Sequence, residues 1–450
     1  MTMPWVDESP REECGVVGIS GMDVAAEHAF LAMYALQHRG QEAAGMVTFD
    51  EEGLHVLKGP GAVGDVFETW SIRKKLRGRT AVGHLRYSTA GGSDLENIQP
   101  ITARYANGTI ALAHNGNLTN HFDLRKRLVD DGAIFRTTSD SETLIHLIAK
   151  SRHDTVDAQV DDALTHLEGA FSIVLAIDET IYAARDPRGF RPLVLGRKDG
   201  GAIVASETCA LDILGAEYVR DLQPGEVIRI RDGVVKQLRS LPPAEHPSPC
   251  IFELVYFSRP DSRLWGISVD AARRAFGRQL AKEHPVEADA VIAVPDSANS
   301  AALGYAEESG IPFELGMLRH HYVGRTFIKP SQEDRDFGAR MKYSPVRGVL
   351  EGRRVVVVDD SLVRGTTSRS LVRMLRGAGA DEVHFRIGSP PVKWPCFYGI
   401  DMPTKGELIG SNLEVPEIAG ELGVESLGYL SLQGMVDAVA TGGPYCTACF

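Results

Sequence analysis

The stretch VVVVDDSLVRGTTS, from Val355 to Ser368, constrains the fold more than any other part of this 450-residue chain. An apolar run of four valines is typical of a central parallel strand, because helices cover both faces of such a strand. Two acidic residues end the run, and a polar loop containing one glycine leads into a helical pattern. This order of strand, acidic loop and helix predicts an open α/β sheet, whose ligands collect beyond the carboxyl ends of the strands.

The best candidate for a domain boundary is SLPPAEHPSPC, from Ser240 to Cys250, which has four prolines in eleven residues. Prolines at this density resist both helix and central strand. Before the boundary, short strand-like runs such as GVVGIS and FSIVLAI, with segregated helices, predict an α+β domain. After it, strands alternate with helices, which predicts a doubly wound α/β domain.

Composition narrows the class of protein. The formal net charge of −12 argues against binding of nucleic acid or an anionic membrane as the main activity. No apolar run approaches the length of a membrane span, and the acidic stretch MTMPWVDESPREE lacks the apolar core of a secretory signal. We therefore expect a cytoplasmic protein, whose six cysteines are metal ligands, catalytic groups or core residues rather than disulfides.

The loop after the valine run has the composition of a site for a phosphorylated sugar. Gly365 permits the unusual dihedral angles of a phosphate loop, and the first helical N–H groups, with the hydroxyls of Thr366–Ser368, can cradle a phosphate. Because carboxylates repel phosphate, Asp359 and Asp360 are better suited to sugar hydroxyls or to a Mg²⁺ ion. The alternative is that the two acids only cap the helix.

This stretch closely resembles the phosphoribosyl pyrophosphate signature of type I phosphoribosyltransferases, in which paired acids hold the ribose hydroxyls and the next loop holds the 5′-phosphate. The resemblance implies a phosphoribosyl pyrophosphate site made of Asp359, Asp360, Ser361, Arg364, Gly365, Thr366, Thr367 and Ser368. It also implies one Mg²⁺ ion per subunit, at Ser297, Asp359 and Asp360. The earlier VIAVPDSANSA is similar to the pyrophosphate loop of that family and adds Asp296, although Asp-Ser after a strand is also an ordinary helix cap.

The segment RHHYVGRTFIKPSQEDRDFGARMKYS is rich in cations and glycine and has no clear period. We predict that Tyr322–Lys342 is a lid that orders over the substrate and excludes water. The alternative is a solvated surface loop.

Cys14 lies in REECGVVGIS, directly after two acidic residues and before an apolar run. One interpretation is a buried structural cysteine. The other is that the first 13 residues are removed, so that Cys14 carries a free α-amine of pKa about 7.7–8.0. Such an amine can accept the thiol proton and return it to a leaving amine. A thiol nucleophile also needs groups that grip the substrate and oxyanion donors, and polar segments such as GHLRYSTAGG, HNGNLTN and TTSDSE offer them.

Together these segments resemble the glutaminase domain of the amino-terminal-nucleophile hydrolases, and the chain from Cys14 almost to Phe450 resembles the amidophosphoribosyltransferase family. The resemblance implies a propeptide (1–13), a class II glutaminase domain with the α+β, αββα amino-terminal-nucleophile (Ntn) fold (14–240) and an α/β type I phosphoribosyltransferase domain (250–450). It implies that Cys14 is the nucleophile, that Asn115 and Gly116 form the oxyanion hole, and that Arg86 and Asp140 bind the α-carboxylate and α-ammonium of glutamine. Taken alone, Asn-Gly is only a turn signal.

The resemblance implies a glycosyltransferase that converts glutamine, water and 5-phosphoribosyl pyrophosphate into 5-phosphoribosylamine, glutamate and pyrophosphate, the first committed step of purine synthesis. It also implies a homo-oligomer, a tetramer, inhibited by purine nucleotides. A shared ammonia intermediate implies a channel between the two sites. A different glutamine amidotransferase, such as an aminosugar synthase or asparagine synthetase, is disfavoured by DDSLVRGTTS. A nonenzymatic nucleotide sensor is disfavoured by the complete glutaminase set.

The remaining cysteines suggest a metal site. The carboxy-terminal YCTACF is a C-x-x-C pair that needs two further ligands. Four thiolates suit either zinc or a [4Fe–4S] cluster, spacing alone does not separate these, and a packing role is the third alternative. One branch of the family carries a [4Fe–4S] cluster and a short propeptide, and this resemblance assigns one structural, oxygen-sensitive cluster per subunit to Cys250, Cys396, Cys446 and Cys449. We interpret Cys209 as a core residue.

Overall fold

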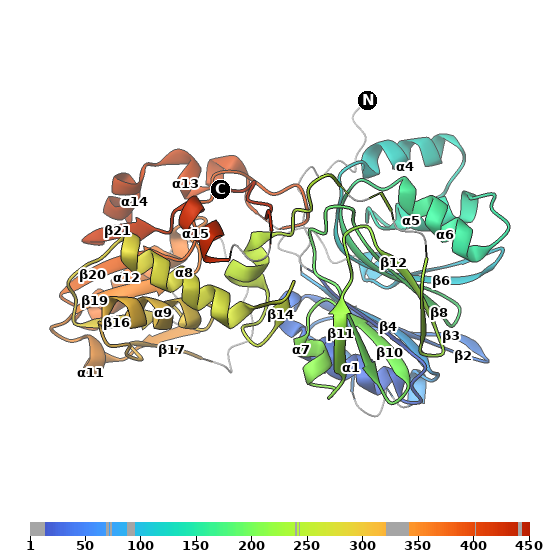
Figure 1. Cartoon of the computed structure of the whole chain (residues 1–450), viewed down its shortest axis with the longest axis horizontal. Coiled ribbons are helices and arrows are strands. Elements are labelled where there is room, and N and C mark those ends of the chain that lie inside the picture. Colours follow the sequence, from blue (N-terminus) through green and yellow to red (C-terminus); the bar gives the residue numbers. More distant parts are fainter. Residues whose placement is uncertain are drawn as a thin grey trace.

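The computed structural model describes residues 14–68, 72, 74–87, 95–238, 241–242, 244–320, 342–400, 402–439 and 443–450. The predicted propeptide and nearly all of the predicted lid lie outside these residues. Two domains stand side by side in Figure 1, one built on two antiparallel sheets and the other on a parallel sheet.

The first domain contains a seven-stranded and a six-stranded antiparallel sheet. The seven-stranded sheet has the order β11-β9-β10-β1-β4-β2-β3, with β1 (Gly15–Ser20), β2 (Ala43–Asp50), β3 (Gly53–Pro60), β4 (Thr80–Arg86), β9 (Val194–Lys198), β10 (Gly201–Ala205) and β11 (Glu217–Asp221). The six-stranded sheet has the order β13-β12-β8-β7-β6-β5, with β5 (Ile101–Tyr105), β6 (Gly108–Leu118), β7 (Gly169–Ile177), β8 (Thr180–Arg185), β12 (Val227–Arg231) and β13 (Val234–Gln237).

Helices cover the outer face of each sheet. The seven-stranded sheet packs on α1 (Ala25–Ala35), α2 (Val63–Val66) and α7 (Cys209–Asp212), and the six-stranded sheet on α4 (His121–Asp130), α5 (Glu142–Lys150) and α6 (Val156–Thr165). Strand β7 shows why its run is apolar throughout, since Phe171 and Ile173 face the helices while Val174 faces the opposite sheet. The predicted αββα sandwich is therefore confirmed.

The second domain has a parallel sheet of order β16-β19-β20-β21, with β16 (Ala290–Ala293), β19 (Arg354–Asp359), β20 (Glu382–Ile387) and β21 (Ser426–Tyr429). Its main helices are α8 (Val269–Glu283), α9 (Asn299–Ser309), α12 (Thr366–Gly377), α14 (Val415–Leu422) and α15 (Leu432–Ala438). The four valines 355–358 are fully buried, as a central strand requires. The predicted α/β domain is confirmed.

Short elements complete the second domain. They are β14 (Arg263–Leu264), β15 (Ile267–Ser268), β17 (Met317–Arg319), β18 (Tyr343–Pro345), α11 (Arg347–Leu350), α13 (Ile409–Asn412) and η4 (Lys405–Glu407). In the first domain, η1 (Gln37–Arg39) and η2 (Leu95–Asn97) are 3₁₀ turns. No helix of the described part of the chain is long and apolar enough to cross a bilayer.

The proline-rich segment before Cys250 lies along the first domain. The Leu241 N–H donates to the Gly225 carbonyl at 2.7 Å, and the Ser248 N–H to the Arg188 carbonyl at 2.7 Å. A π-helical turn, η3 (Glu253–Phe257), follows directly. The segment therefore connects the two domains while remaining docked on one of them.

Candidate active sites

Cys14 lies at the start of β1, where both sheets of the first domain contribute neighbours. Gly15 pairs with Leu85 on β4, so Arg86 occupies the register position opposite Cys14. The backbone N–H of Cys14 donates to Oδ1 of Asn115, on β6 of the other sheet, at 3.4 Å. The structure thus brings the predicted nucleophile to Arg86 and to the predicted oxyanion residue.

The Asn115–Gly116 pair has the properties of an oxyanion site. Asn115 is buried, and its Nδ2 has no hydrogen-bond partner among the described residues. A buried donor without a partner costs about 1–3 kcal/mol, so such a group calls for a ligand. Gly116 has φ +145°, and a Cβ at this position would lie 2.0 Å from the Ala170 carbonyl oxygen, so only glycine fits.

Asp140 is a buried carboxylate held by hydrogen bonds. It accepts from the Leu118 N–H at 2.8 Å and from the Ser141 hydroxyl at 3.1 Å, and His114 Nδ1 lies 3.8 Å away. Burial acts to raise the pKa of the carboxyl, but His114 and the Leu118 N–H outweigh it and lower the pKa of Asp140 to about 2. Asp140 is therefore ionised at neutral pH and suited to an ammonium group.

Arg86 is a cation with spare donor capacity. Its Nη1 has no hydrogen-bond partner among the described residues, although this nitrogen atom is buried. The carboxylate of Glu42 lies nearby, with its Oε2 3.9 Å from the Arg86 Nε. An Arg fork with unused donors matches the geometry of a substrate carboxylate.

The second site lies at the carboxyl end of β19, as predicted. Asp360 donates its N–H to Asp359 Oδ1 at 2.9 Å, and its carboxylate accepts hydrogen bonds from the hydroxyls of Ser361, at 2.7 Å, and Ser297. Burial and mutual repulsion raise the pKa of Asp359 well above its ordinary value. Burial also raises the pKa of Asp360, although Ser297, Ser361 and Arg273 oppose the shift. Two acids this close, one of them buried, are suited to a cation or to sugar hydroxyls.

The loop after the acid pair leads into α12. Gly365 has φ +73° and precedes Thr366, the first residue of the helix, so the N–H groups of Thr366, Thr367 and Ser368 lie at a helix N-terminus. Arg364 lies at the surface and pairs with Glu407 at 3.1 Å. In the turn that follows the neighbouring strand β16, Asp296 pairs with Arg319 at 3.1 Å. The structure therefore gathers the predicted phosphoribosyl pyrophosphate residues at one sheet edge.

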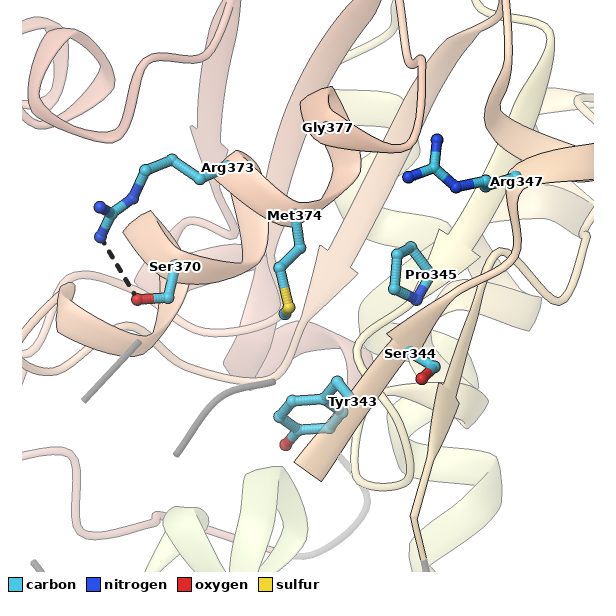
Figure 2. Close-up of a pocket in the computed structure, with 8 residues that line it drawn as sticks. All are labelled: Tyr343, Ser344, Pro345, Arg347, Ser370, Arg373, Met374 and Gly377. Atoms are coloured by element: carbon cyan, nitrogen blue, oxygen red, sulfur yellow. Dashed lines mark hydrogen bonds between the residues drawn. The ribbon is translucent and has the colours of Figure 1, made fainter. Parts of the chain in front are cut away.

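A cavity of about 350 Å³ adjoins this edge (Figure 2). Its lining is Tyr343, Ser344, Pro345, Arg347, Ser370, Arg373, Met374 and Gly377. Burial, and the negative charges of Asp359, Asp360 and Asp296, raise the pKa of Tyr343 to about 12. Tyr343 therefore stands between the acid pair and a cavity whose two arginines give it positive charge.

The structure brings the four predicted cluster cysteines together from three parts of the chain. Cys250 and Cys446 form a parallel bridge, in which the Cys446 N–H donates to the Pro249 carbonyl at 2.8 Å. The Cys449 carbonyl accepts from the N–H groups of Lys393, at 2.8 Å, and Trp394, at 3.1 Å, just before Cys396. Burial raises the pKa of Cys250, Cys446 and Cys449. Cys209 is buried elsewhere and is a core residue, as predicted.

In the described ranges, no three His, Cys, Asp or Glu side chains form a group that could hold one ion. A tetrahedral zinc site requires four ligands at about 2.3 Å from the metal.

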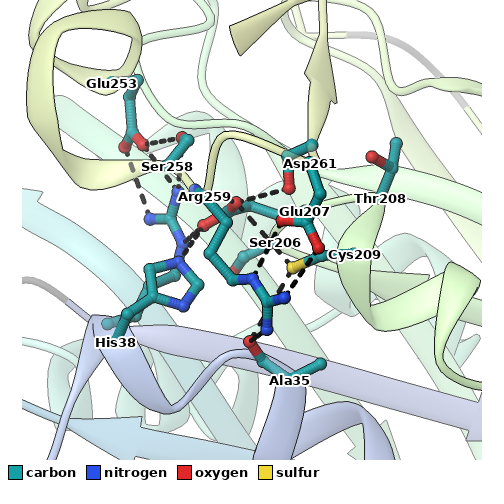
Figure 3. A network of polar contacts seen from close by, with 12 residues as sticks. Ala35, His38, Ser206, Glu207, Thr208, Cys209, Glu253, Ser258, Arg259 and Asp261 are labelled. Atoms are coloured by element: carbon teal, nitrogen blue, oxygen red, sulfur yellow. Dashed lines mark hydrogen bonds and ion pairs between the residues drawn. The ribbon is translucent and has the colours of Figure 1, made fainter. Parts of the chain in front are cut away.

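A buried charge network that the sequence did not reveal joins the two domains (Figure 3). Glu253, in η3, accepts from Arg39 Nη2 at 2.6 Å, from Arg191 Nη1 at 3.2 Å and from the Ser258 hydroxyl at 2.8 Å. Arg39 also pairs with Glu207, and both carboxylates are fully buried. The one feature of the sequence that indicates a buried charge here is the single Glu inside the otherwise apolar CIFELVYF.

Comparison with known proteins agrees with this geometry. Residues 84–212 match the family model described as a glutamine amidotransferase domain. The chain is 49% identical to the amidophosphoribosyltransferase of Bacillus subtilis, over 98% of this chain and 93% of that protein. It is 53% identical to the chloroplastic amidophosphoribosyltransferase 1 of Arabidopsis thaliana, over 99% of this chain and 79% of that protein.

Solved structures give the same result. The glutamine phosphoribosylpyrophosphate amidotransferase of B. subtilis, complexed with ADP and GMP, superposes with a TM-score of 0.90 at 48% identity, covering 97% of this chain and 96% of the other. The similarity extends over nearly the full chain. The αββα sandwich and the acid pair at the parallel sheet agree with the same family. The chain belongs to the amidophosphoribosyltransferase family, and it is a glycosyltransferase that makes 5-phosphoribosylamine from 5-phosphoribosyl pyrophosphate with ammonia from glutamine, the first step of purine biosynthesis.

Proposed function

We propose that Cys14 is the amino-terminal nucleophile that releases ammonia from glutamine in this enzyme. The observation that carries the proposal is the contact of the Cys14 nitrogen with Asn115, whose own buried amide donor is unpaired. The thiolate attacks the side-chain amide carbon, and the terminal amine takes the thiol proton and passes it to the departing ammonia. Water then hydrolyses the thioester to glutamate. Asn115 Nδ2 and the Gly116 N–H stabilise the oxyanion in both steps.

The α-carboxylate of glutamine binds Arg86, and its α-ammonium binds Asp140. The unused Nη1 of Arg86 and the lowered pKa of Asp140 support these roles. The free α-amine that this mechanism needs requires removal of residues 1–13 before Cys14.

In the second site, Asp359 and Asp360 hold the ribose hydroxyls, and residues Arg364–Ser368 hold the 5′-phosphate. Ser361 belongs to the same substrate site, where its hydroxyl donates to Asp360. The ammonia nitrogen attacks C1 of the ribose while the bond from C1 to pyrophosphate breaks. The carboxylates and the Ser297 hydroxyl are oxygen donors of the kind that Mg²⁺ prefers, and they fit this ion. Bound there, Mg²⁺ would offset the charge of the departing pyrophosphate.

Cys250, Cys396, Cys446 and Cys449 hold a [4Fe–4S] cluster in this proposal. Their gathering from three parts of the chain supports a bound group, and four thiolates are the ligands that a [4Fe–4S] cluster requires. An apolar shell that includes Phe252, Val392 and Met402 would limit solvent access.

We also propose regulation by purine nucleotides, supported by the B. subtilis relative, which was solved with ADP and GMP. Homo-oligomeric assembly, as a tetramer, and a cytoplasmic location remain predictions.

The test compares two nitrogen donors, glutamine and ammonium chloride at high concentration. Cys14→Ser and Asn115→Ala should abolish glutamine-dependent synthesis and keep ammonia-dependent synthesis, because only the first site is damaged. Asp359→Asn should reduce synthesis with either donor and keep the first domain folded. Glutamine hydrolysis by Cys14→Ser at the wild-type rate would refute the proposed nucleophile.

A further inference from the structure

The loop Trp394–Ile400 of the second domain, which we call the Cys396 loop, lies against the oxyanion residues of the first domain. Gly399 is in direct contact with Gly116. A Cβ at position 399 would lie 2.8 Å from the Gly116 carbonyl carbon and 3.0 Å from its Cα, and Gly399 has φ +91°. Both the close approach and the backbone angle therefore require glycine.

Two further contacts fix the loop on the first domain. Asn117, the residue after Gly116, donates from Nδ2 to the Phe397 carbonyl at 2.9 Å. The Tyr398 carbonyl accepts from Arg191 Nη2 at 3.1 Å, and the Tyr398 ring stacks on Phe190 with centroids 4.2 Å apart. Three consecutive residues of the loop, 397–399, thus contact either β6 or the segment after β8 that contains Phe190 and Arg191.

The other side of the loop is anchored within the second domain. The Tyr398 N–H donates to Cys396 Sγ at 3.3 Å, and the N–H groups of Lys393 and Trp394 donate to the Cys449 carbonyl. The carboxy-terminal cysteine segment therefore holds the loop in place.

We propose that Gly399 and the Phe397 carbonyl are positioning groups of the oxyanion hole, so that the second domain completes the glutaminase site of the first. Oxyanion donors act only when they are held within about 0.5 Å of the productive geometry. Gly399 packs against the Cα and carbonyl carbon of Gly116. The Phe397 carbonyl holds the next residue, Asn117, by accepting a hydrogen bond from its side-chain amide. The inference rests on the proposed role of Asn115 and Gly116.

This arrangement has a chemical consequence. Glutamine is hydrolysed at full rate only when the loop of the ammonia-consuming domain is docked on the ammonia-producing site. The residue whose N–H stabilises the oxyanion is therefore held in place by the domain that uses the released nitrogen.

The test uses Gly399→Ala in the full-length enzyme, with Gly406→Ala as a matched control, because a Cβ at Gly406 meets nothing within 4 Å. Gly399→Ala should lower kcat for glutamine hydrolysis at least about tenfold and leave KM for glutamine within about twofold, since the oxyanion forms only in the transition state. Ammonia-dependent synthesis should stay at the wild-type rate. Asn117→Ala should show the same split to a smaller degree, and it serves as the second variant where Gly399→Ala fails to fold.

Three results would overturn the inference: normal kcat in both variants, a rise in KM alone, or equal loss of glutamine-dependent and ammonia-dependent activity. Asn115→Ala distinguishes a failure of the loop's proposed role from a failure of the proposed oxyanion hole. If Asn115→Ala hydrolyses glutamine normally, the oxyanion assignment itself is wrong. If it is inactive while Gly399→Ala and Asn117→Ala are normal, only the role of the loop is wrong.

Discussion

Replacing Glu253 by Gln should destabilise the protein far more than the loss of an ordinary surface ion pair. Glu253 is fully buried, and Arg39 and Arg191 donate to it at 2.6 and 3.2 Å. Glutamine preserves the volume but removes the charge, so two buried guanidinium groups lose a shared counterion. Breaking a buried pair costs about 3–5 kcal/mol. Because Glu207 stays beside Arg39, we expect the lower end of this range, about 3 kcal/mol.

Glu307→Gln is the matched control. Its carboxylate also receives two arginines, Arg274 at 2.8 Å and Arg278 at 3.0 Å, but its side chain is 48% exposed. Water and mobile ions screen such a pair, so the expected loss is about 0.2–1 kcal/mol. Urea unfolding of both variants, with midpoint and slope fitted separately, measures the difference. Equal midpoint shifts for Glu253→Gln and Glu307→Gln would refute the view that burial sets the strength of the network.

Three further substitutions test a buried histidine, the glutamine site and the cysteine cluster. Burial lowers the pKa of His84 to about 3, against the opposing effect of its hydrogen bond to the His114 carbonyl. Between pH 6.5 and 3 the unfolded chain therefore binds a proton that the native protein does not. Stability should fall with acidification by up to about 1.4 kcal/mol per pH unit, and His84→Asn should lose this part of the slope in urea titrations at pH 7 and pH 5. Asp140→Asn should raise KM for glutamine and leave ammonia-dependent synthesis intact, and an unchanged KM would exclude the ammonium contact. Cys446→Ser should lower the iron and sulfide content of anaerobically purified protein, whereas Cys209→Ser should not, and equal metal content in both would contradict the cluster assignment.

The fold could be predicted where local pattern decides it. The valines 355–358 indicate a buried strand, and the acids that follow lie at its carboxyl end because chain direction places them there. Gly365 at the start of α12 follows from the same local logic, since the turn needs positive φ. These features depend on neighbours in sequence.

Long-range contacts could not be predicted from the residues themselves. Cys14 and Asn115 are 101 positions apart, and only the register between β1 and β4 and the stacking of two sheets bring them together. In the sequence, Glu253 is a single acidic residue in an apolar run. Its role could not be predicted, because its partners come from η1 and from the segment after β8, both far away in the chain. Gly399 gave no signal, since its requirement for glycine arises from Gly116 in another domain.

The intact mass of the purified native protein, measured together with its rate of glutamine hydrolysis, tests whether Cys14 acts as an amino-terminal nucleophile. The purified chain should begin at Cys14, whose thiol and α-amine act on the same substrate. A chain that retains Met1–Glu13 and still hydrolyses glutamine at full rate would refute the role of a terminal amine.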